Sequence, residues 1–267
     1  MNTAHSTLGK RPLAADQLAI LVRRSIRTSG RVPQLLMFSL TMPMAMLVLF
    51  SQVFRSIADS PQFPPGVSYI DFLTPAMLAV STVMAGTNAG LAAAIDHTNG
   101  VHERFRTLPM SPRLPSVART INEALFTLAR GAILVGCAAA LGFRFHGTAL
   151  DAATGVAVVL VLAAAMSALF GRIGDRLRRP DVVQFAGMMT MMPFMFVSGA
   201  FAPLATMPDW MRTAAAFNPV AQATEALRGS VLGTATAGDT ATAIAAAVAF
   251  WAVVTLVPAL PQPGRKA

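Results

Sequence analysis

Two ionisable residues stand inside an apolar stretch of the sequence, where a charge needs a partner. Glu123 and Arg130 lie seven positions apart in the stretch from about 117 to 143. A charge at the centre of a membrane helix costs about 2.5–3.5 kcal/mol on insertion scales, so such residues usually face a bundle interior or a water-filled cavity. A helix puts both on one face, about 10 Å apart along its axis. They pair only if the long side chains bend toward each other.

Three roles for these two residues stay open from the sequence. Glu123 can sit near the inner membrane interface while the Arg130 side chain snorkels toward water. The two can form a structural pair at a bundle or subunit interface, or they can contact a bound substrate. Asn88, between Gly86 and Gly90, is a third polar residue at membrane depth, and its amide is suited to a hydrogen bond with a neighbouring helix.

Catalytic and nucleotide-binding signatures are missing from the sequence. No Gly-x-x-x-x-Gly-Lys-Ser/Thr phosphate loop, His-Glu-x-x-His zinc motif or Gly-x-Ser-x-Gly nucleophile elbow occurs. The four histidines are scattered along the chain, which is typical of ordinary loop residues rather than metal ligands. The single cysteine, Cys137, excludes a disulfide framework and a cysteine-based metal site. We therefore expect no catalytic residue, no metal and no cofactor in this chain.

A short charged segment, DHTNGVHERFRTLPMSPRLP, separates two of the apolar stretches. A glycine permits the chain to turn, and three prolines limit the length of any helix. Its charged side chains can form polar contacts and its apolar side chains can pack into a partner's surface, so the segment is suited to docking onto a cytoplasmic partner. A solvated loop would have the same composition. The candidate docking residues are Gly100, Glu103, Arg104, Phe105, Arg106, Leu108 and Pro109.

The composition of the whole chain indicates a membrane protein. Of its 267 residues, 54% are hydrophobic and only 12% are charged, which is about half the charged fraction that is usual in soluble domains. The net charge is +9, and the basic residues lie between apolar stretches. This pattern is typical of a protein oriented in a membrane by its basic loops rather than of a nucleic-acid-binding protein. The sequence therefore predicts an all-α integral membrane protein whose partners include the lipid bilayer and no nucleic acid.

Six apolar stretches are long enough to cross the hydrocarbon core, which takes about 20 residues of helix. With the N-terminus inside, and with Arg119 at the start of the third stretch counted as inner, the inner segments hold sixteen of the 21 Lys and Arg residues and the outer segments hold four. This asymmetry satisfies the positive-inside rule and predicts that both termini are cytoplasmic. A five-span alternative would put one end outside, against the basic pair near the C-terminus. The predicted spans, within one transmembrane domain over 32–260, are about 32–54, 69–95, 117–143, 152–171, 182–201 and 240–260.

The segments outside these spans have their own character. Within the N-terminal segment 1–31, the stretch DQLAILVRRSIRT has an apolar stripe with basic residues largely off it. This predicts an amphipathic helix along the inner interface, with a simple positive anchor as the plainer alternative. The Pro-rich segment from 202 to 229 predicts re-entrant or interfacial helices in the outer leaflet, with Trp210 at headgroup level. A cytoplasmic tail is expected over 261–267.

Two motifs resemble hallmarks of the type-2 ABC transporter permeases, in particular the daunorubicin-resistance-type drug and lipid exporters of actinobacteria. The resemblance covers roughly 15–260, although the C-terminal end lacks the strongly basic tail that is usual in the family. The first hallmark, Asp-x-x-x-Gly-x-x-x-Arg-x-Arg-x-Leu-Pro-x-Ser, is met by Asp96, Gly100, Arg104, Arg106, Leu108, Pro109 and Ser111. The second, Ser-Gly-x-Phe-x-Pro followed by Pro-x-Trp, Asn-Pro and Arg-Gly, is met by Ser198, Gly199, Phe201, Pro203, Pro208, Trp210, Asn218, Pro219, Arg228 and Gly229.

This resemblance implies a multi-pass half-transporter of the plasma membrane. Members of the family pair as homodimers or heterodimers and dock two copies of a separate ATP-binding subunit, which binds and hydrolyses the ATP. The loop would be the coupling helix, and the chain would supply the path for a hydrophobic or amphipathic drug, antibiotic or lipid. The alternative is a non-ABC membrane protein, either an assembly factor or a secondary transporter. Matching halves, which a secondary transporter usually has, are not visible in the sequence.

Overall fold

The computed structural model describes residues 23, 33–56, 63, 66–99, 114–201 and 203–256. These residues form helices and connecting turns without a strand, so the predicted all-α class is confirmed. The predicted interface helix within 1–31 and the tail over 261–267 lie outside the described residues, apart from Arg23, which is helical and exposed. The described elements are α2 (Pro33–Val53), α3 (Tyr69–Thr98), α5 (Leu114–Ala140), α6 (Ala149–Leu177), α7 (Pro180–Phe196), η2 (Leu204–Thr206), α8 (Asp209–Phe217), α9 (Pro219–Leu232) and α10 (Ala237–Leu256).

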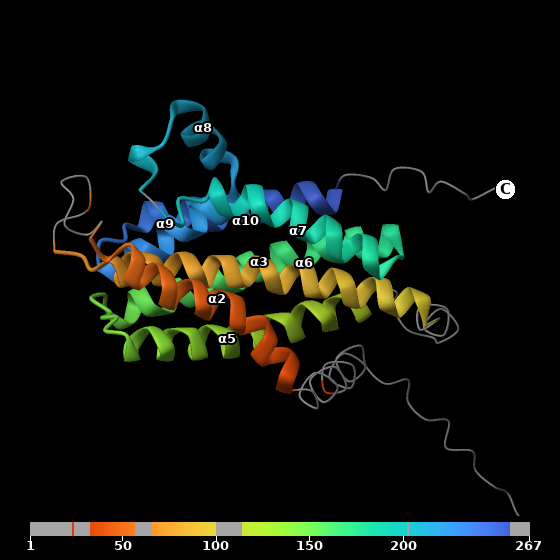
Figure 1. Ribbon diagram of the computed structural model, residues 1–267. Helices are drawn as coiled ribbons and strands as arrows, with labels where there is room; N and C mark the ends of the chain where they lie inside the picture. The colour runs from red at the N-terminus through yellow and green to blue at the C-terminus, as the bar shows by residue number, and fades with distance from the viewer. Residues whose placement is uncertain are drawn as a thin grey trace, which may run out of the picture.

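The long helices lie side by side in one bundle (Figure 1). The central helix is α3, which contacts α2, α5, α6, α7 and α9. Next to it, α6 packs against α5, α7, α9 and α10. The short helix α8 stands off the bundle at one end and is joined to it through α9 (Figure 1). The bundle therefore has one end that carries α8 and an opposite end where α3 stops and α5 begins.

Small residues bring α3 and α6 into close contact. A Cβ atom added at Gly86 would lie 2.7 Å from the Cβ of Met166, and one at Gly90 would lie 2.5 Å from the carbonyl oxygen of Phe170. From the α6 side, a Cβ at Gly174 would lie 2.1 Å from the carbonyl oxygen of Gly90. The Gly-x-x-x-Gly pair of α3 therefore lets two backbones meet, as small residues do in membrane helix pairs.

The described helices have the lengths and composition of a membrane protein. Among them, Tyr69–Thr98, Thr120–Ala140 and Ala149–Leu177 are long and apolar enough to cross a bilayer. Shorter apolar helices cover Ser39–Val53 and Gly238–Val253. A helix overlaps each of the six ranges that the sequence marked as spans. The chain is thus a helical membrane protein.

Local hydrogen bonds set helix ends that hydropathy does not locate. The sequence places a span over 152–171, whereas the α6 helix occupies Ala149–Leu177. Thr148 and Asp151 form a capping box that starts this helix early. Arg178, in the left-handed region with φ of 52°, ends it. The helix therefore continues beyond the apolar core at both ends.

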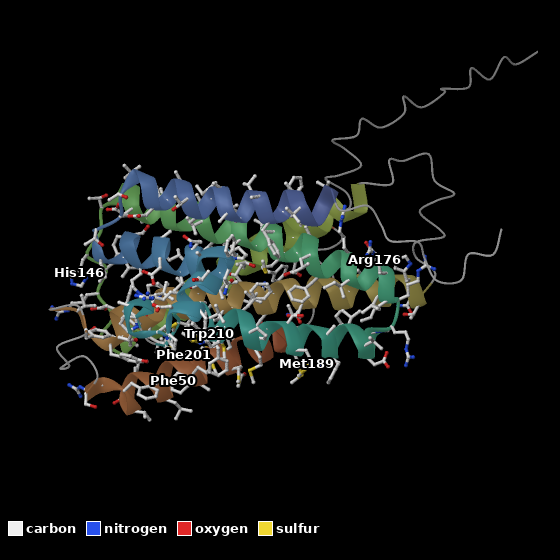
Figure 2. The ribbon with its side chains drawn as sticks, turned by 90° about the horizontal axis from the view of Figure 1, so that it is seen from above. Phe50, His146, Arg176, Met189, Phe201 and Trp210 are labelled. Carbon is white, nitrogen blue, oxygen red and sulfur yellow. The ribbon has the colours of Figure 1, made fainter. Side chains whose placement is uncertain are left out.

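The two ends of the bundle differ in chemistry. Figure 2 places Phe50 and Phe201 toward one end and Arg176 at the other. The rings of Phe50 and Phe201 meet edge to face, with their centres 5.1 Å apart. At the opposite end, His97 Nε2 lies 3.2 Å from Asp175 Oδ1, which joins the C-terminal ends of α3 and α6. The α8 end therefore includes this aromatic packing, and the opposite end includes a polar contact between α3 and α6.

Candidate functional site

The predicted docking loop lies outside the described residues. Its neighbours in the chain are described: α3 ends at Thr98 and α5 begins at Leu114, both at the end of the bundle opposite α8 (Figure 1). The other predicted residues fall into two groups, an intramembrane pocket and a cluster at the α8 end. The residues outside the described part are Gly100, Glu103, Arg104, Phe105, Arg106, Leu108 and Pro109.

A pocket of about 520 Å³ lies between α2, α3, α5 and α7. This volume is within the range of small-molecule sites, roughly 300–1,000 Å³. Most of its wall is apolar, with Leu91, Phe126 and Met191 among the contributors. The polar lining residues are Ser39, Thr87, Asn88, Glu123, Arg130 and Gln184. The structure therefore brings together in one site the three residues that the sequence singled out as polar at membrane depth.

Glu123 and Arg130 form an ion pair along α5. Arg130 Nη2 donates to Glu123 Oε2 at 3.2 Å and to Thr127 Oγ1 at 3.1 Å. Arg130 is only 6% exposed. The two long side chains thus bend toward each other along the helix, with Thr127 between them. Neither charge is left without an opposite charge in these apolar surroundings, where an unpaired one would be costly.

The guanidinium of Arg130 is incompletely bonded. Both of its hydrogen bonds use Nη2, and its buried Nε has no hydrogen-bond partner. A buried N–H that makes no bond costs about 1–3 kcal/mol in lost hydration. In the described part of the chain, the other buried side-chain atom without a partner is Asn122 Oδ1, on the same helix. Unmet hydrogen-bonding capacity is therefore concentrated on α5.

Asn88 lines the pocket but does not join two helices. Among the described residues, this exposed side chain makes no hydrogen bond to a neighbouring helix. The reason is its position on α3. It lies two residues from both Gly86 and Gly90, and at about 3.6 residues per turn it points away from the glycine face that packs on α6.

At the end of the bundle that carries α8, Arg228 on α9 joins three segments. Its Nη2 donates to the Gly199 carbonyl at 3.1 Å and its Nε donates to the Phe72 carbonyl at 3.4 Å. Its Cζ lies 3.5 Å from the centre of the Phe72 ring, a cation–π contact, and its Nη1 contacts the Glu225 carboxylate. Arg228 is 5% exposed. It therefore fastens α9 to the start of α3 and to the turn after α7.

Asn218 and Pro219 set the start of α9. The Asn218 side chain caps the helix, with Oδ1 accepting the N–H of Val220 at 2.9 Å. Its Nδ2 donates to the carbonyl of Phe194 at 3.0 Å. Pro219 occupies the first helical position, where its missing N–H has no helical partner to lose. The Asn-Pro pair thus anchors α9 against α7.

The segment after α7 is a tight turn that contacts α3. The Ser198 hydroxyl is buried and donates to the carbonyl of Met195 at 2.7 Å. Gly199 follows with φ of 68°, a left-handed conformation that favours glycine. The Tyr69 hydroxyl then donates to the carbonyl of Phe201 at 3.3 Å. These bonds hold the turn against the first turn of α3.

The remaining residues of this motif shape helix ends and expose one aromatic ring. Pro203 precedes η2, and Pro208 precedes α8. The Gly229 carbonyl accepts the backbone N–H of Thr234 at 3.0 Å where α9 ends. Trp210, on α8, is 67% exposed. The motif residues therefore hold helix ends and turns in place, except for Trp210, whose exposed ring is suited to a membrane interface.

Sequence reasoning missed Asp71, which is buried on the first turn of α3. Its Oδ1 accepts the backbone N–H of Arg144 at 2.8 Å, and its Oδ2 accepts the Ser68 hydroxyl at 2.7 Å. The carboxylate therefore fastens the α5–α6 connection to α3. An acid three residues after a serine at the start of an apolar stretch is a visible capping signal. Thr127, which bonds Arg130, and Gln184, which lines the pocket, were also missed, and no comparable sequence pattern marks them.

The sequence is similar to known transporter proteins. The profile of the protein family described as ABC-2 type transporter matches residues 16–232. The chain is 28% identical over 197 residues, 72% of its own length and 68% of the relative's, to the daunorubicin resistance ABC transporter permease protein DrrB1 of Streptomyces coeruleorubidus. It is 30% identical over 112 residues, 42% of its length and 39% of the relative's, to the doxorubicin resistance ABC transporter permease protein DrrB of two Mycobacterium tuberculosis strains. The family match includes both motifs and every helix of the pocket.

Proposed function

We propose that this chain, which belongs to the ABC-2 type transporter family and is a permease homologous to drug-resistance membrane subunits, forms the translocation path of an exporter powered by a separate ATP-binding subunit. The observation that carries the proposal is the family match over residues 16–232. Because the match establishes the family, the alternatives of a secondary transporter or an assembly factor outside the ABC class are set aside.

The partners of the chain follow from that role. Two copies of the ATP-binding subunit dock on the cytoplasmic side, and a second permease subunit completes the path as a homodimer or a heterodimer. ATP is bound by the partner, since the sequence of this chain has no phosphate loop. The names of the relatives concern daunorubicin and doxorubicin resistance. They favour an amphipathic drug or antibiotic as cargo, with a lipid as the alternative.

The proposed topology has six spans in the plasma membrane and both termini in the cytoplasm. It is supported by the helices that overlap all six apolar ranges and by the excess of Lys and Arg in the inner segments. It places the α8 end of the bundle outside, and the opposite end, from which the docking loop leaves, inside. The helices α8 and α9 then lie in the outer leaflet, between the fifth and sixth spans.

Cysteine labelling tests this topology in a Cys137→Ser background. A cysteine at Ala214, exposed on α8, should react with a membrane-impermeant maleimide added to intact cells, because the topology places α8 outside. A cysteine at Thr107 in the loop should react only after the cells are permeabilised. Labelling of Thr107→Cys in intact cells, with Ala214→Cys protected, would overturn the topology.

The docking role of the loop is tested by replacing Glu103, Arg104 and Phe105 together with alanine. Truncating one side of a buried charged contact costs about 2–5 kcal/mol. The variant should therefore insert normally but lose co-purification with the ATP-binding subunit or uncouple that subunit's ATPase from export. The matched control replaces Arg179 and Asp181, an exposed ion pair outside the loop, and should keep the partner. Normal export and normal co-purification by the triple variant would show that the loop does not dock.

A further inference from the structure

We infer that His97 and Asp175 form a coupling contact, which passes a displacement of the docking loop from α3 to the corner between α6 and α7. This inference rests on the proposed function, in which an ATP-binding subunit moves that loop. It goes further by naming the two side chains that carry the movement away from the loop. They act through their positions, since neither is among the described residues that line the pocket.

The coupling contact joins two helix ends that already lie close together. A Cβ added at Gly174 of α6 would lie 2.1 Å from the carbonyl oxygen of Gly90 and 2.9 Å from the Cβ of Ala93. His97 follows Ala93 by about one helical turn. Asp175 follows Gly174 directly. The polar contact therefore continues the close packing of α3 on α6 to the ends of both helices.

The contact is a hydrogen bond in a partly buried position. His97 Nε2 lies 3.2 Å from Asp175 Oδ1, and the His97 side chain is 12% exposed, against 40% for Asp175. An ionised carboxylate only accepts hydrogen bonds, so the imidazole Nε2 carries the proton and donates. The charged residues beside this pair, Asp96, Arg172 and Arg176, have interactions of their own. Because both helix ends are charged, the role of this one pair has to be separated from the others by a rescue variant.

The position of His97 connects the contact to the docking loop. His97 lies one residue before Thr98, the last residue of α3, and Asn99 is the C-cap. The segment that we propose to dock follows directly in the sequence. The last turn is bonded to the helix, since the Ile95 carbonyl accepts the Asn99 N–H at 3.0 Å. A displacement of the loop therefore carries the His97 ring along with the end of α3.

The position of Asp175 connects the contact to α7. Two residues, Arg178 and Arg179, join α6 to α7. The Gly174 carbonyl accepts the N–H of Arg178 at 3.0 Å. The Arg179 carbonyl accepts the N–H of Val183 at 3.0 Å, so the link is bonded to both helices. A displacement at the end of α6 therefore reaches α7, which lines the pocket.

The contact makes the end of α3 and the α6–α7 corner move together. Both α3 and α7 contribute to the pocket wall, while α5 contributes the ion pair of Glu123 and Arg130. With the contact in place, a displacement at the loop shifts two helices of that wall at once. Without it, the ends of α3 and α6 separate and absorb the displacement. ATP is then hydrolysed without a matching change in the pocket.

Transport per ATP hydrolysed, in proteoliposomes that hold the chain and its ATP-binding subunit, tests the inference. The probe is a fluorescent hydroxyanthraquinone, an amphipathic molecule. His97→Ala should keep co-purification and ATPase activity, but transport per ATP should fall about fivefold, at the low end of typical coupling between sites. Asp175→Ala truncates the more exposed partner, where the fold tolerates change best, and should give the same loss. Unchanged transport per ATP in both variants would overturn the inference.

A rescue variant and a matched control separate coupling from general stability. His97→Lys returns a donor that can reach Asp175, so it should recover most of the transport per ATP. His146→Ala changes an exposed histidine at the opposite end of the bundle and should leave transport per ATP unchanged (Figure 2). A His97→Lys variant as poorly coupled as His97→Ala would also overturn the inference.

The wild-type chain separates failure of this inference from failure of the proposed function. If the wild type moves no probe when its subunit hydrolyses ATP, the proposed function is refuted, and this inference with it. If the wild type moves the probe and both alanine variants move as much per ATP, the coupling contact alone is refuted.

Discussion

Two arginines are buried in the described part of the chain, and their hydrogen bonds differ. Arg228 uses Nε and both Nη atoms, on the Phe72 carbonyl, the Gly199 carbonyl and Glu225. Arg130 uses Nη2 alone and leaves Nε without a partner. A fully bonded buried cation holds one arrangement of the chain, whereas the buried Nε of Arg130 carries the cost of lost hydration without a hydrogen bond. We therefore assign Arg228 a role in holding the fold together.

Arg228→Met should destabilise the fold by about 1–3 kcal/mol, because the buried carbonyls of Phe72 and Gly199 lose their donor. Arg212→Met is the matched control, since Arg212 pairs with Asp209 on the exposed α8 helix. That control should stay within about 0.5 kcal/mol of the wild type. Thermal unfolding in detergent, followed by circular dichroism, measures both. Equal midpoints for the two variants would mean that the bonds of Arg228 do not stabilise the fold.

These same residues show how far the sequence predicts the sites. The Arg-Gly motif marks Arg228, but its acceptor at Phe72 lies 156 positions away in the chain, and no local pattern pairs them. Glu123 and Arg130 share a helix face, so their pairing could be weighed from spacing alone. The pocket around them could not be predicted from spacing, because residues of four separate helices form it.

At the scale of helices, α3 is held on two faces by close contacts. Gly86 and Gly90 bring it onto α6, and its Thr87 meets Gly187 of α7, where an added Cβ would lie 2.0 Å from the Thr87 Cγ2. These contacts leave no room for a side chain at any of the three glycines. The remaining face of α3, which carries Asn88, is therefore free to line the pocket.

Gly90→Ala should destabilise the bundle by about 1–3 kcal/mol, because its Cβ would lie 2.5 Å from the carbonyl oxygen of Phe170 and the two helices must separate. Gly136→Ala on α5 is the matched control, since a Cβ there meets nothing within 4 Å. Alanine should stabilise that helix by up to about 1 kcal/mol. Thermal unfolding of the two variants in one detergent compares them. A Gly90→Ala variant as stable as Gly136→Ala would contradict the close α3–α6 contact.

Hydropathy predicts where helices lie better than which way their residues face. Runs of about 20 apolar residues located the long helices, and the Pro-rich segment after α7 holds the helices α8 and α9. The ends of α6 depend on the Thr148–Asp151 capping box and on left-handed Arg178, which act locally and carry little hydropathy signal. The position of Asn88 on α3 turns it away from α6 and toward the pocket, which the sequence did not indicate.

At the scale of the whole molecule, α3 connects all three regions of interest. Near its first turn, the Phe72 carbonyl and ring hold Arg228. Its middle lines the pocket, and its last residue, Thr98, leads into the loop that we propose as the docking element. A helix of 30 residues spans about 45 Å, the full depth of a bilayer with its headgroups. Motion of an ATP-binding subunit at the loop would therefore reach the pocket along one continuous helix.

We propose that this chain moves an amphipathic molecule only when a separate ATP-binding subunit drives it. The most direct measurement is the movement of a fluorescent hydroxyanthraquinone across proteoliposomes that contain the chain with or without that subunit. We expect ATP-dependent movement when both are present, none with either alone, and none with the triple alanine variant at Glu103, Arg104 and Phe105. Movement at the same rate without the ATP-binding subunit or without ATP would contradict it.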